Sequence, residues 1–342
     1  MIEKCLNNRF FVLYLIPFVL GSSTVFSYQP FNFTLINFFI LPIFFYLIVY
    51  IKQKSKNTYR KKPYRKNLFI FGLTFGFGYY LFGIYWITHS LTFDESFKIL
   101  IPFGLILIPL FLSLFFSLVT LVVGPFLNLN IISIFFLSGS LALSDYLRAK
   151  VLTGFPWNLW AYSTSWATEI IQILNLVGLF AFNLLSITIF MFPAILFFNI
   201  KLGKKFLSLT LLFLLLFFLY IYGNHSINKN QSYLKSNIEK YNIKIISPNF
   251  NLEYGLTPEA IEGRLMKLIR YSEPNKNLKT MFVWPEGVFS GYSFKEILEF
   301  KYIIQENFNK NHLILLGINT FDQKKKVLHN RSVLDNNQLE VI

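Results

Sequence analysis

The chain is poor in cysteine, acidic residues and histidine, and these shortages exclude several classes of function. Cys5 is the single cysteine among 342 residues, so an intrachain disulfide and a CxxC metal or redox motif are excluded. The four histidines, His89, His225, His312 and His329, show no ligand spacing, and we expect neither a metal nor a cofactor. The sequence also contains no G-x-S-x-G, Walker, GxGxxG or HExxH motif.

Apolar residues are abundant instead. They make up 54% of the chain, and the mean hydropathy of +0.49 exceeds that of an ordinary globular domain. Crossing a bilayer takes about 20 residues per helix, and the sixth apolar segment is long enough to tilt, kink or include an interfacial piece. We therefore predict an α-helical polytopic membrane domain over residues 1–223 with seven helices, near Phe10–Phe26, Phe33–Ile51, Leu68–Ile87, Ile99–Val123, Ile131–Leu143, Ile170–Ile200 and Phe206–Tyr222.

Most of the net charge of +15 lies between these apolar segments. Residues 1–223 hold 16 Lys and Arg against 5 Asp and Glu, whereas residues 224–342 hold 16 against 12. Eight basic residues and no acid occur in Lys52–Lys66, and three more lysines occur in residues 201–205. The positive-inside rule places these loops and the N-terminus in the cytoplasm, and residues after Tyr222 on the opposite side. No aromatic-basic motif indicates a nucleic-acid partner.

A loop rich in aromatic residues follows the fifth apolar segment, at residues 152–163. Aromatic side chains of this kind anchor a protein at the level of the lipid headgroups. The alternative is that Phe155–Trp157 forms a lipid-facing wall of an active-site mouth. Just before the loop, Asp145 either reaches toward the interface or pairs with Arg148.

From Asn242 the pattern changes to short strands that alternate with helices. Predicted strands are Asn242–Ser247, Thr280–Trp284, His312–Gly317, Val327–Leu334 and Leu339–Ile342. One predicted helix opens with Thr257 as N-cap and Pro258 at its first position, and another opens with a capping box from Ser293 to Glu296. This alternation predicts an α/β domain over residues 242–342, after a linker at 224–241.

The tetrapeptide Val283–Glu286 places an acidic residue just past the second of these strands. Pro285 cannot continue a regular ladder strand, and α/β folds expose catalytic groups at strand ends. Two interpretations of Glu286 follow. It is either a solvated carboxylate at a strand end or a general base beside a nucleophile, with a pKa set by partial burial and a cationic neighbour.

Several stretches, taken in order along the chain, resemble the apolipoprotein N-acyltransferases, inner-membrane enzymes that complete bacterial lipoprotein maturation. Gly78–Ile87 is similar to the third membrane helix of that family. Asp145–Arg148 followed by Leu152–Trp157 (LTGFPW) resembles a second motif. Val283–Glu286 resembles the motif of the catalytic glutamate, and Asn330–Ser332 resembles a later strand.

The resemblance implies a nitrilase-like (α-β-β-α) domain in the periplasm, attached to a multi-pass domain in the bacterial inner membrane. A cysteine attacks a phospholipid acyl ester, and the resulting thioester passes its acyl chain to the N-terminal amine of a diacylglyceryl-modified apolipoprotein. Glu286 matches the general base of this reaction. Phe155, Pro156 and Trp157 are the residues expected to contact substrate.

The resemblance also leads us to expect an incomplete nitrilase-like domain. The family's oxyanion lysine and its nucleophilic cysteine belong after Ile342, and Cys5 is predicted on the cytoplasmic side. We therefore expect these 342 residues alone to be inactive. Two alternatives remain open: a membrane-anchored nitrilase-like amidase, and a non-catalytic lipid-binding relative.

Overall fold

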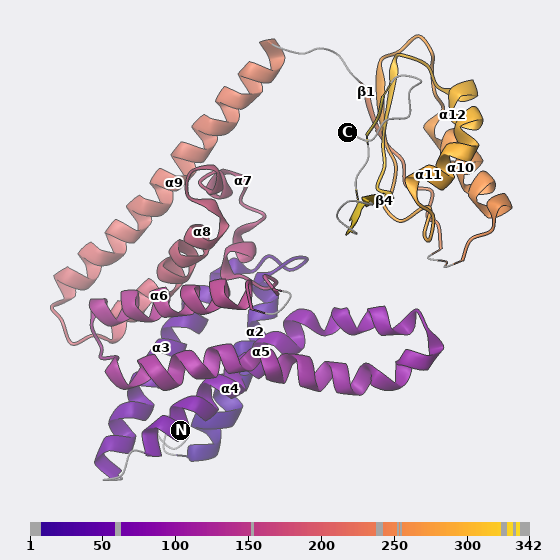
Figure 1. The fold of residues 1–342 in the computed structure, drawn as a ribbon. Helices are drawn as coiled ribbons and strands as arrows, with labels where there is room; N and C mark the ends of the chain where they lie inside the picture. The colour runs from indigo at the N-terminus through magenta and orange to yellow at the C-terminus, as the bar shows by residue number, and fades with distance from the viewer. Residues whose placement is uncertain are drawn as a thin grey trace. The chain divides into compact units, whose positions relative to one another are not determined.

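The computed structural model describes residues 8–58, 63–151, 154–236, 242–251, 253, 255–322, 327–330 and 333–335. The chain forms two compact units, Met1–Tyr233 and Leu234–Ile342 (Figure 1). We call them the membrane unit and the second unit. Residues 224–236, which the sequence analysis assigned to a linker, continue the last helix of the membrane unit. The predicted domain limits stay a prediction.

Within the described residues, six helices are long and apolar enough to cross a membrane. The predicted count of seven is therefore corrected, because the first apolar segment forms only a shorter helix, Phe11–Ser27. That helix ends where Tyr28 becomes extended, two residues before Pro30, which has no N–H to donate. The six spans are Thr34–Lys54, Tyr64–Thr92, Glu95–Phe126, Ile131–Arg148, Leu174–Phe197 and Leu202–Leu234.

Each span contains one main α-helix, sometimes extended by a 3-10 turn. The helices are α3 (Asn37–Thr58), α4 (Pro63–Ile84), α5 (Ile101–Val123), α6 (Ile131–Arg148), α8 (Leu174–Met191) and α9 (Leu202–Ser236). The shorter helix contains α2 (Ile16–Ser23). The sixth apolar segment is interrupted, as its length suggested: α7 (Thr168–Ile171) is separate, and Gly178 has non-helical angles inside α8.

Helices α4 and α5 form a long hairpin, which Figure 1 shows extending away from the other helices of its unit. Small residues allow the close approach. A Cβ atom on Gly76 of α4 would lie 2.8 Å from the Cα atom of Ser113 in α5, and one on Gly72 would lie 2.7 Å from the Cα atom of Ser117. Small residues are the usual contact between membrane helices because they let backbones pack directly.

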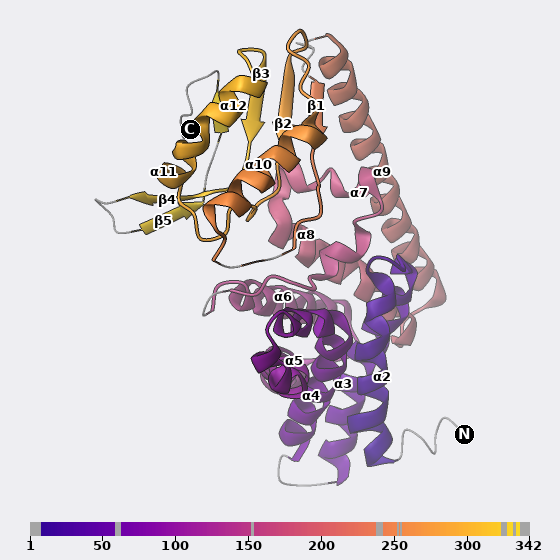
Figure 2. The same cartoon turned by 90° about the vertical axis from the view of Figure 1, so that its right-hand side faces the viewer.

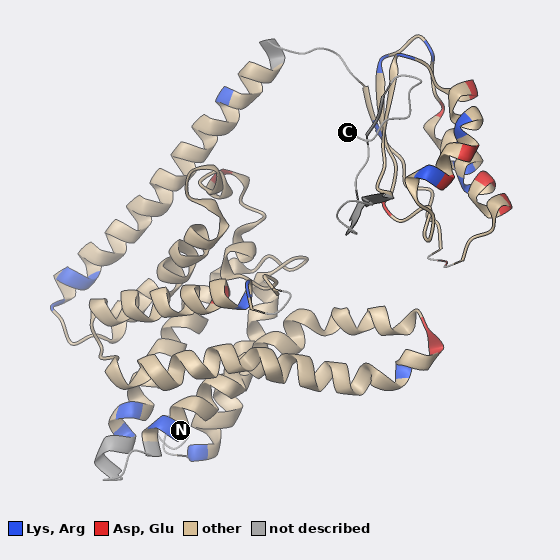
Figure 3. Ribbon diagram, in the orientation of Figure 1, with Lys and Arg blue, Asp and Glu red and all other residues tan. Residues whose placement is uncertain are grey.

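Charged residues in the membrane unit lie near the helix ends (Figure 3). Lys and Arg are found at the end of α3 and the beginning of α4. At the far end of the hairpin, Asp94 follows the 3-10 helix η4 (Tyr85–Thr92), and Glu95 is the first residue of the 3-10 helix η5 (Glu95–Leu100). The interior is aromatic, with Phe44 and Phe75 packed at a ring-centroid distance of 4.4 Å. The unit is thus built as a multi-pass membrane protein.

The second unit contains a small sheet covered by helices on one face (Figure 2). Three strands are parallel, and β6 (Val333–Asp335) joins their edge antiparallel, in the order β1-β2-β3-β6. The parallel strands are β1 (Asn242–Ile245), β2 (Thr280–Val283) and β3 (His312–Leu315). The helices are α10 (Pro258–Ser272), α11 (Phe294–Ile297) and α12 (Lys301–Asn307).

Local signals in this unit are confirmed. The Thr257 hydroxyl accepts the N–H of Ala260 at 3.3 Å and caps α10, and the capping box from Ser293 to Glu296 is formed. The predicted single strand Val327–Leu334 is wrong. Its first part, β5 (Val327–Asn330), pairs with an unpredicted β4 (Asn319–Asp322), and its last part belongs to β6, which pairs with β3.

Candidate functional site

Glu286 lies immediately beyond β2. The last rung of the sheet is made by Trp284, whose backbone N–H donates to the carbonyl of Leu315 at 2.8 Å. Its indole Nε1 donates to the Ser272 hydroxyl at 3.0 Å, which fixes the buried ring against α10. Pro285 then ends the ladder, and Glu286 opens a turn.

The turn that carries Glu286, residues 286–291, is anchored by its apolar members. Val288 and Phe289 are buried in the core of the second unit, whereas Glu286 is exposed. Gly287 and Gly291 have φ values of +73° and +86°, a region that glycine occupies at little cost. The backbone of the turn is thus held from inside, and the carboxylate is accessible to solvent within this unit.

The position of this turn follows from the parallel register. Ile245 of β1 is paired with Val283 of β2, and the N–H of Ile246 donates to the carbonyl of Val283 at 2.9 Å. The loops that follow β1, β2 and β3 therefore emerge at one carboxyl edge of the sheet, where α/β proteins bind ligands. Glu286 lies at that edge, as its place after the second strand predicts.

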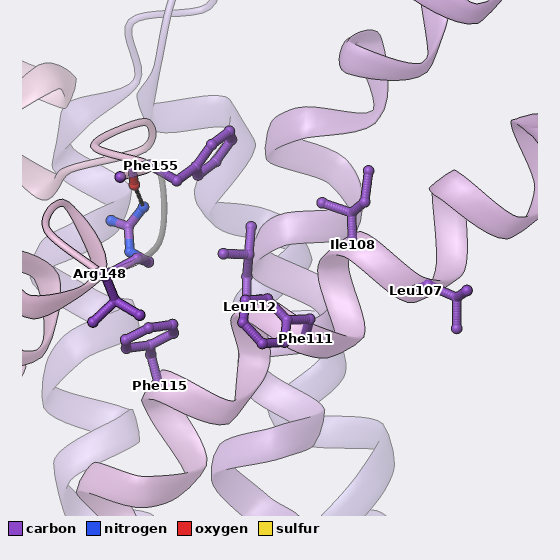
Figure 4. A pocket seen from close by; sticks show the side chains of 9 residues that line it. Leu107, Ile108, Phe111, Leu112, Phe115, Arg148 and Phe155 are labelled. Carbon is purple, nitrogen blue, oxygen red and sulfur yellow. Dashed lines mark hydrogen bonds between the residues drawn. The ribbon is translucent and has the colours of Figure 1, made fainter.

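The other predicted site residues, Phe155, Pro156 and Trp157, belong to the membrane unit. We call residues 154–158 the aromatic loop; Leu152 and Thr153 of the LTGFPW motif lie outside the described residues, as do Arg331 and Ser332 of the later motif. The Arg148 guanidinium donates to the carbonyl of Phe155 (Figure 4). It also donates to the carbonyl of Trp157 at 2.8 Å.

Arg148 is itself fixed by a buried acid. Its Nη2 atom lies 3.0 Å from Oδ1 of Asp145, so these residues pair rather than reach to the interface. The other carboxylate oxygen of Asp145 accepts a hydrogen bond from Nδ2 of Asn183 at 2.9 Å. Oδ1 of Asn183 in turn accepts the N–H of Ala161 at 3.1 Å. Sequence reasoning missed Asn183, since nothing local marks its contact with a residue 38 positions earlier.

The far end of the aromatic loop is held by α4. The Tyr79 hydroxyl donates to the carbonyl of Asn158, and it lies 2.6 Å from the hydroxyl of Tyr28. Asn158 has a φ of +55°, which turns the chain sharply at this point. Both ends of the aromatic loop are therefore fixed by buried side chains of the membrane helices.

Two pockets are lined by the aromatic loop. The first, of about 310 Å³, contains Phe155 and Arg148, and its other lining residues are almost wholly apolar, as Figure 4 shows. The second, of about 770 Å³, contains Trp157 and Asn158 among many aromatic side chains. Tyr162 also lines the second pocket, and its burial raises the pKa of its hydroxyl, which stays protonated at neutral pH. Volumes and linings of this kind suit apolar ligands.

Among the residues that the structure describes, no cluster of three His, Cys, Asp or Glu side chains could hold a metal ion. The described residues present a carboxylate at a sheet edge in the second unit, and apolar pockets beside the aromatic loop in the membrane unit.

Comparison with known proteins identifies related chains. The family model of the apolipoprotein N-acyltransferase N-terminal domain matches residues 20–192. A Rhodopseudomonas palustris protein named apolipoprotein N-acyltransferase is 26% identical over 294 residues, which is 82% of this chain and 52% of the relative. Proteins of the same name from Rickettsia prowazekii and Brucella suis are each 28% identical, over 296 and 185 residues.

The fraction of this chain and the fraction of the relative that are covered differ between the alignments. The Rickettsia prowazekii alignment covers 84% of this chain and 55% of the relative, and the Brucella suis alignment covers 53% and 34%. The chain thus spans about half the length of the Rhodopseudomonas palustris and Rickettsia prowazekii relatives. Coverage above 80% of this chain takes the similarity past Tyr233 into the second unit.

Proposed function

This chain belongs to the apolipoprotein N-acyltransferase family, and from that membership we propose that the protein transfers an acyl chain from a membrane phospholipid to a lipoprotein. The acceptor is the N-terminal amine of a diacylglyceryl-modified cysteine. The matched region, residues 20–192, includes the aromatic loop and all the residues that line its two pockets. No observation favours an amidase or a non-catalytic lipid-binding protein over this function.

The observation that carries the proposal is the aromatic loop, which borders two apolar pockets in a membrane-spanning unit. A phospholipid acyl chain is apolar and is delivered by the bilayer itself. We assign Phe155, Pro156 and Trp157 to the wall along which the donor lipid approaches. Trp157 is 51% exposed, so its indole is available to an incoming lipid.

We further propose that Glu286 acts as the general base. A base must be within reach of the proton that it removes, and an exposed carboxylate at the carboxyl edge of a parallel sheet is accessible to a substrate amine or a nucleophile. The small parallel sheet with helices on one face is compatible with a nitrilase-like α/β domain, and the similarity to acyltransferases that continues past Tyr233 supports the same assignment.

For location, we propose the bacterial inner membrane, with the N-terminus in the cytoplasm and the second unit in the periplasm. These two locations require the shorter helix Phe11–Ser27 to cross the membrane in addition to the six spans. The support is the distribution of charge, since basic residues gather at the end of α3 and the beginning of α4 while acids lie at the far end of the α4–α5 hairpin.

The test uses the protein expressed from its complete reading frame and purified in detergent. It is supplied with a phospholipid carrying a labelled acyl chain and with a synthetic diacylglyceryl lipopeptide, and mass spectrometry follows the lipopeptide. We expect one acyl chain to be added to its amine. Failure of the wild-type protein to acylate the lipopeptide would overturn the proposed function.

The role of Glu286 is tested by Glu286→Gln, which keeps the shape of the side chain and removes its basicity. General-base catalysis contributes about 10²–10⁴-fold, and we expect a rate loss of that order. Glu299→Gln is the matched control, because Glu299 is an exposed glutamate in a 3-10 turn of the same unit. Normal activity of Glu286→Gln would refute its role as base.

A further inference from the structure

Arg264 is a buried cation on α10, only 8% exposed. It lies on the inner side of the helix, since Leu265 and Leu268 beside it enter the core of the second unit. A guanidinium in such surroundings is costly unless its N–H groups find acceptors. Two of those acceptors are backbone carbonyls: Nη1 donates to Val288 at 2.8 Å, and Nη2 donates to Asn251 at 3.1 Å.

The two carbonyls belong to loops that follow neighbouring strands. Asn251 lies in the loop after β1, and Val288 lies in the turn after β2, two residues beyond Glu286. Because Ile245 and Val283 are in register, both loops leave the sheet at its carboxyl edge. One planar guanidinium therefore joins the loop after β1 to the turn that carries Glu286.

Further contacts fix the orientation of Arg264. Nη2 also donates to Oε2 of Glu253 at 2.9 Å, and the ring of Phe250 lies 5.0 Å from the guanidinium carbon. The side chain of Glu253 is 55% exposed, so water screens that ion pair. The hydrogen bond to the carbonyl of Val288 is buried, and it is the contact that places the turn.

We propose that Arg264 is the positioning residue of the turn that carries Glu286. The inference deepens the proposed function and depends on the role of Glu286 as general base. Arg264 acts on the backbone two residues away from Glu286 and couples it to the loop after β1. A misplacement of about 1 Å in a reacting group costs up to about 100-fold in rate, so a loosened turn slows the reaction with little effect on substrate binding.

The experiment compares Arg264→Met and Arg264→Lys with wild type in the acyl-transfer assay, using protein from the complete reading frame. Methionine keeps the apolar stem and removes both donors. We expect Arg264→Met to lower kcat by about 10-fold or more while KM for the phospholipid stays within about 2-fold. Arg264→Lys keeps the charge but has no planar fork, and we expect its kcat between those of wild type and Arg264→Met.

Arg270→Met is the matched control, because Arg270 is an exposed arginine on the same helix. We expect its kcat and KM to equal the wild-type values. If Arg264→Met does not yield folded protein, the Lys variant decides the question. Wild-type kcat in the folded Arg264 variant would overturn the proposal, as would a rise in KM without a fall in kcat.

Failure of this inference is separable from failure of the proposed function. If Glu286→Gln is inactive while both Arg264 variants retain wild-type kcat, the base is confirmed and only its positioning by Arg264 is refuted. If Glu286→Gln retains full activity, the role of Glu286 is refuted first, and the positioning proposal falls with it.

Discussion

Arg148 and Asp145 form an ion pair with a nitrogen–oxygen distance of 3.0 Å, and the side chains are 1% and 9% exposed, respectively. They lie one turn apart on α6, but the effect of the pair extends beyond that helix. Through Arg148 the pair holds two carbonyls of the aromatic loop, and through Asn183 it holds the N–H of Ala161.

Removal of one partner of this pair is expected to destabilise the membrane unit. Asp145→Asn leaves the Arg148 cation buried without its counter-charge, and breaking a buried pair in this way typically costs about 3–5 kcal/mol. A lowered thermal unfolding temperature in detergent is the readout. Asp94→Asn is the control, since Asp94 is an exposed N-cap and asparagine caps equally well. An unchanged unfolding temperature for Asp145→Asn would show that the pair is not structural.

The contact between α4 and α5 gives a second prediction. In Gly76→Ala the new methyl group meets Ser113 of α5 at less than a normal contact distance, so the helices must separate. Overpacking of this kind costs about 1–3 kcal/mol. Gly139→Ala on α6 is the control, because apart from its chain neighbours and the nearby backbone of α6 no described atom lies within 4 Å of the position that its methyl group would take. Equal unfolding temperatures for the two variants would contradict the predicted packing.

The proposed role of the aromatic loop in binding the donor lipid gives a third prediction, which depends on the proposed function. Trp157→Ala removes an aromatic side chain from the larger pocket, and we expect KM for the phospholipid donor to rise by about 5-fold or more, which corresponds to about 1 kcal/mol of lost binding. Phe126→Ala is the control, since Phe126 is a comparably exposed aromatic residue that lines neither pocket. Initial rates over a range of phospholipid concentrations give the KM of each variant. Equal KM values for Trp157→Ala and Phe126→Ala would contradict the prediction.

A pH dependence follows from the capping box. Hydrogen bonds from the Ser293 backbone N–H, and then from its hydroxyl, hold the pKa of Glu296 below its usual value of 4.5. A carboxyl group whose pKa is lower in the folded state stabilises the fold above its unfolded-state pKa, and that contribution is lost as the pH falls through the folded-state pKa. Between neutral pH and about pH 5 we expect no change, and below that range increasing loss of the cap.

This prediction is measured by amide hydrogen exchange at the start of α11. The wild-type protein should lose protection there as the pH falls below the usual glutamate pKa, after correction for the intrinsic exchange rate. Glu296→Gln should show protection that does not change over the same pH range, because glutamine does not titrate. A pH dependence that persists in Glu296→Gln would assign the effect to another group.

Signals that act within a few residues were readable from the sequence. Thr257 and Ser293 mark helix starts because a cap bonds to an N–H only three positions away. Pro285 marks the end of β2 for a similarly local reason. Glu286 was therefore placed correctly at a strand end, although its exposure depends on how the turn packs and was not readable.

Features set by distant contacts were not readable. The segment Val327–Leu334 has one continuous strand pattern, but its two parts pair with different strands, and only the fold reveals the break. Asn183 and Arg264 look like ordinary polar residues in helical sequence, and their roles arise from partners on other elements. The number of spans was overestimated because composition does not show where Phe11–Ser27 stops being helical.

Helix α9 is longer than a bilayer requires. Its 35 residues extend about 50 Å at 1.5 Å per residue, against a hydrocarbon thickness of about 30 Å. The surplus is polar, from Asn224 to Ser236, and it remains helical. The number of residues in the polar part of α9 therefore sets both how far the helix extends and the direction in which its last residue points. Deleting four residues from its polar part would shorten it by about 6 Å and rotate its last residue by about 40° about the helix axis, so the height and the direction at which the helix ends cannot be varied independently.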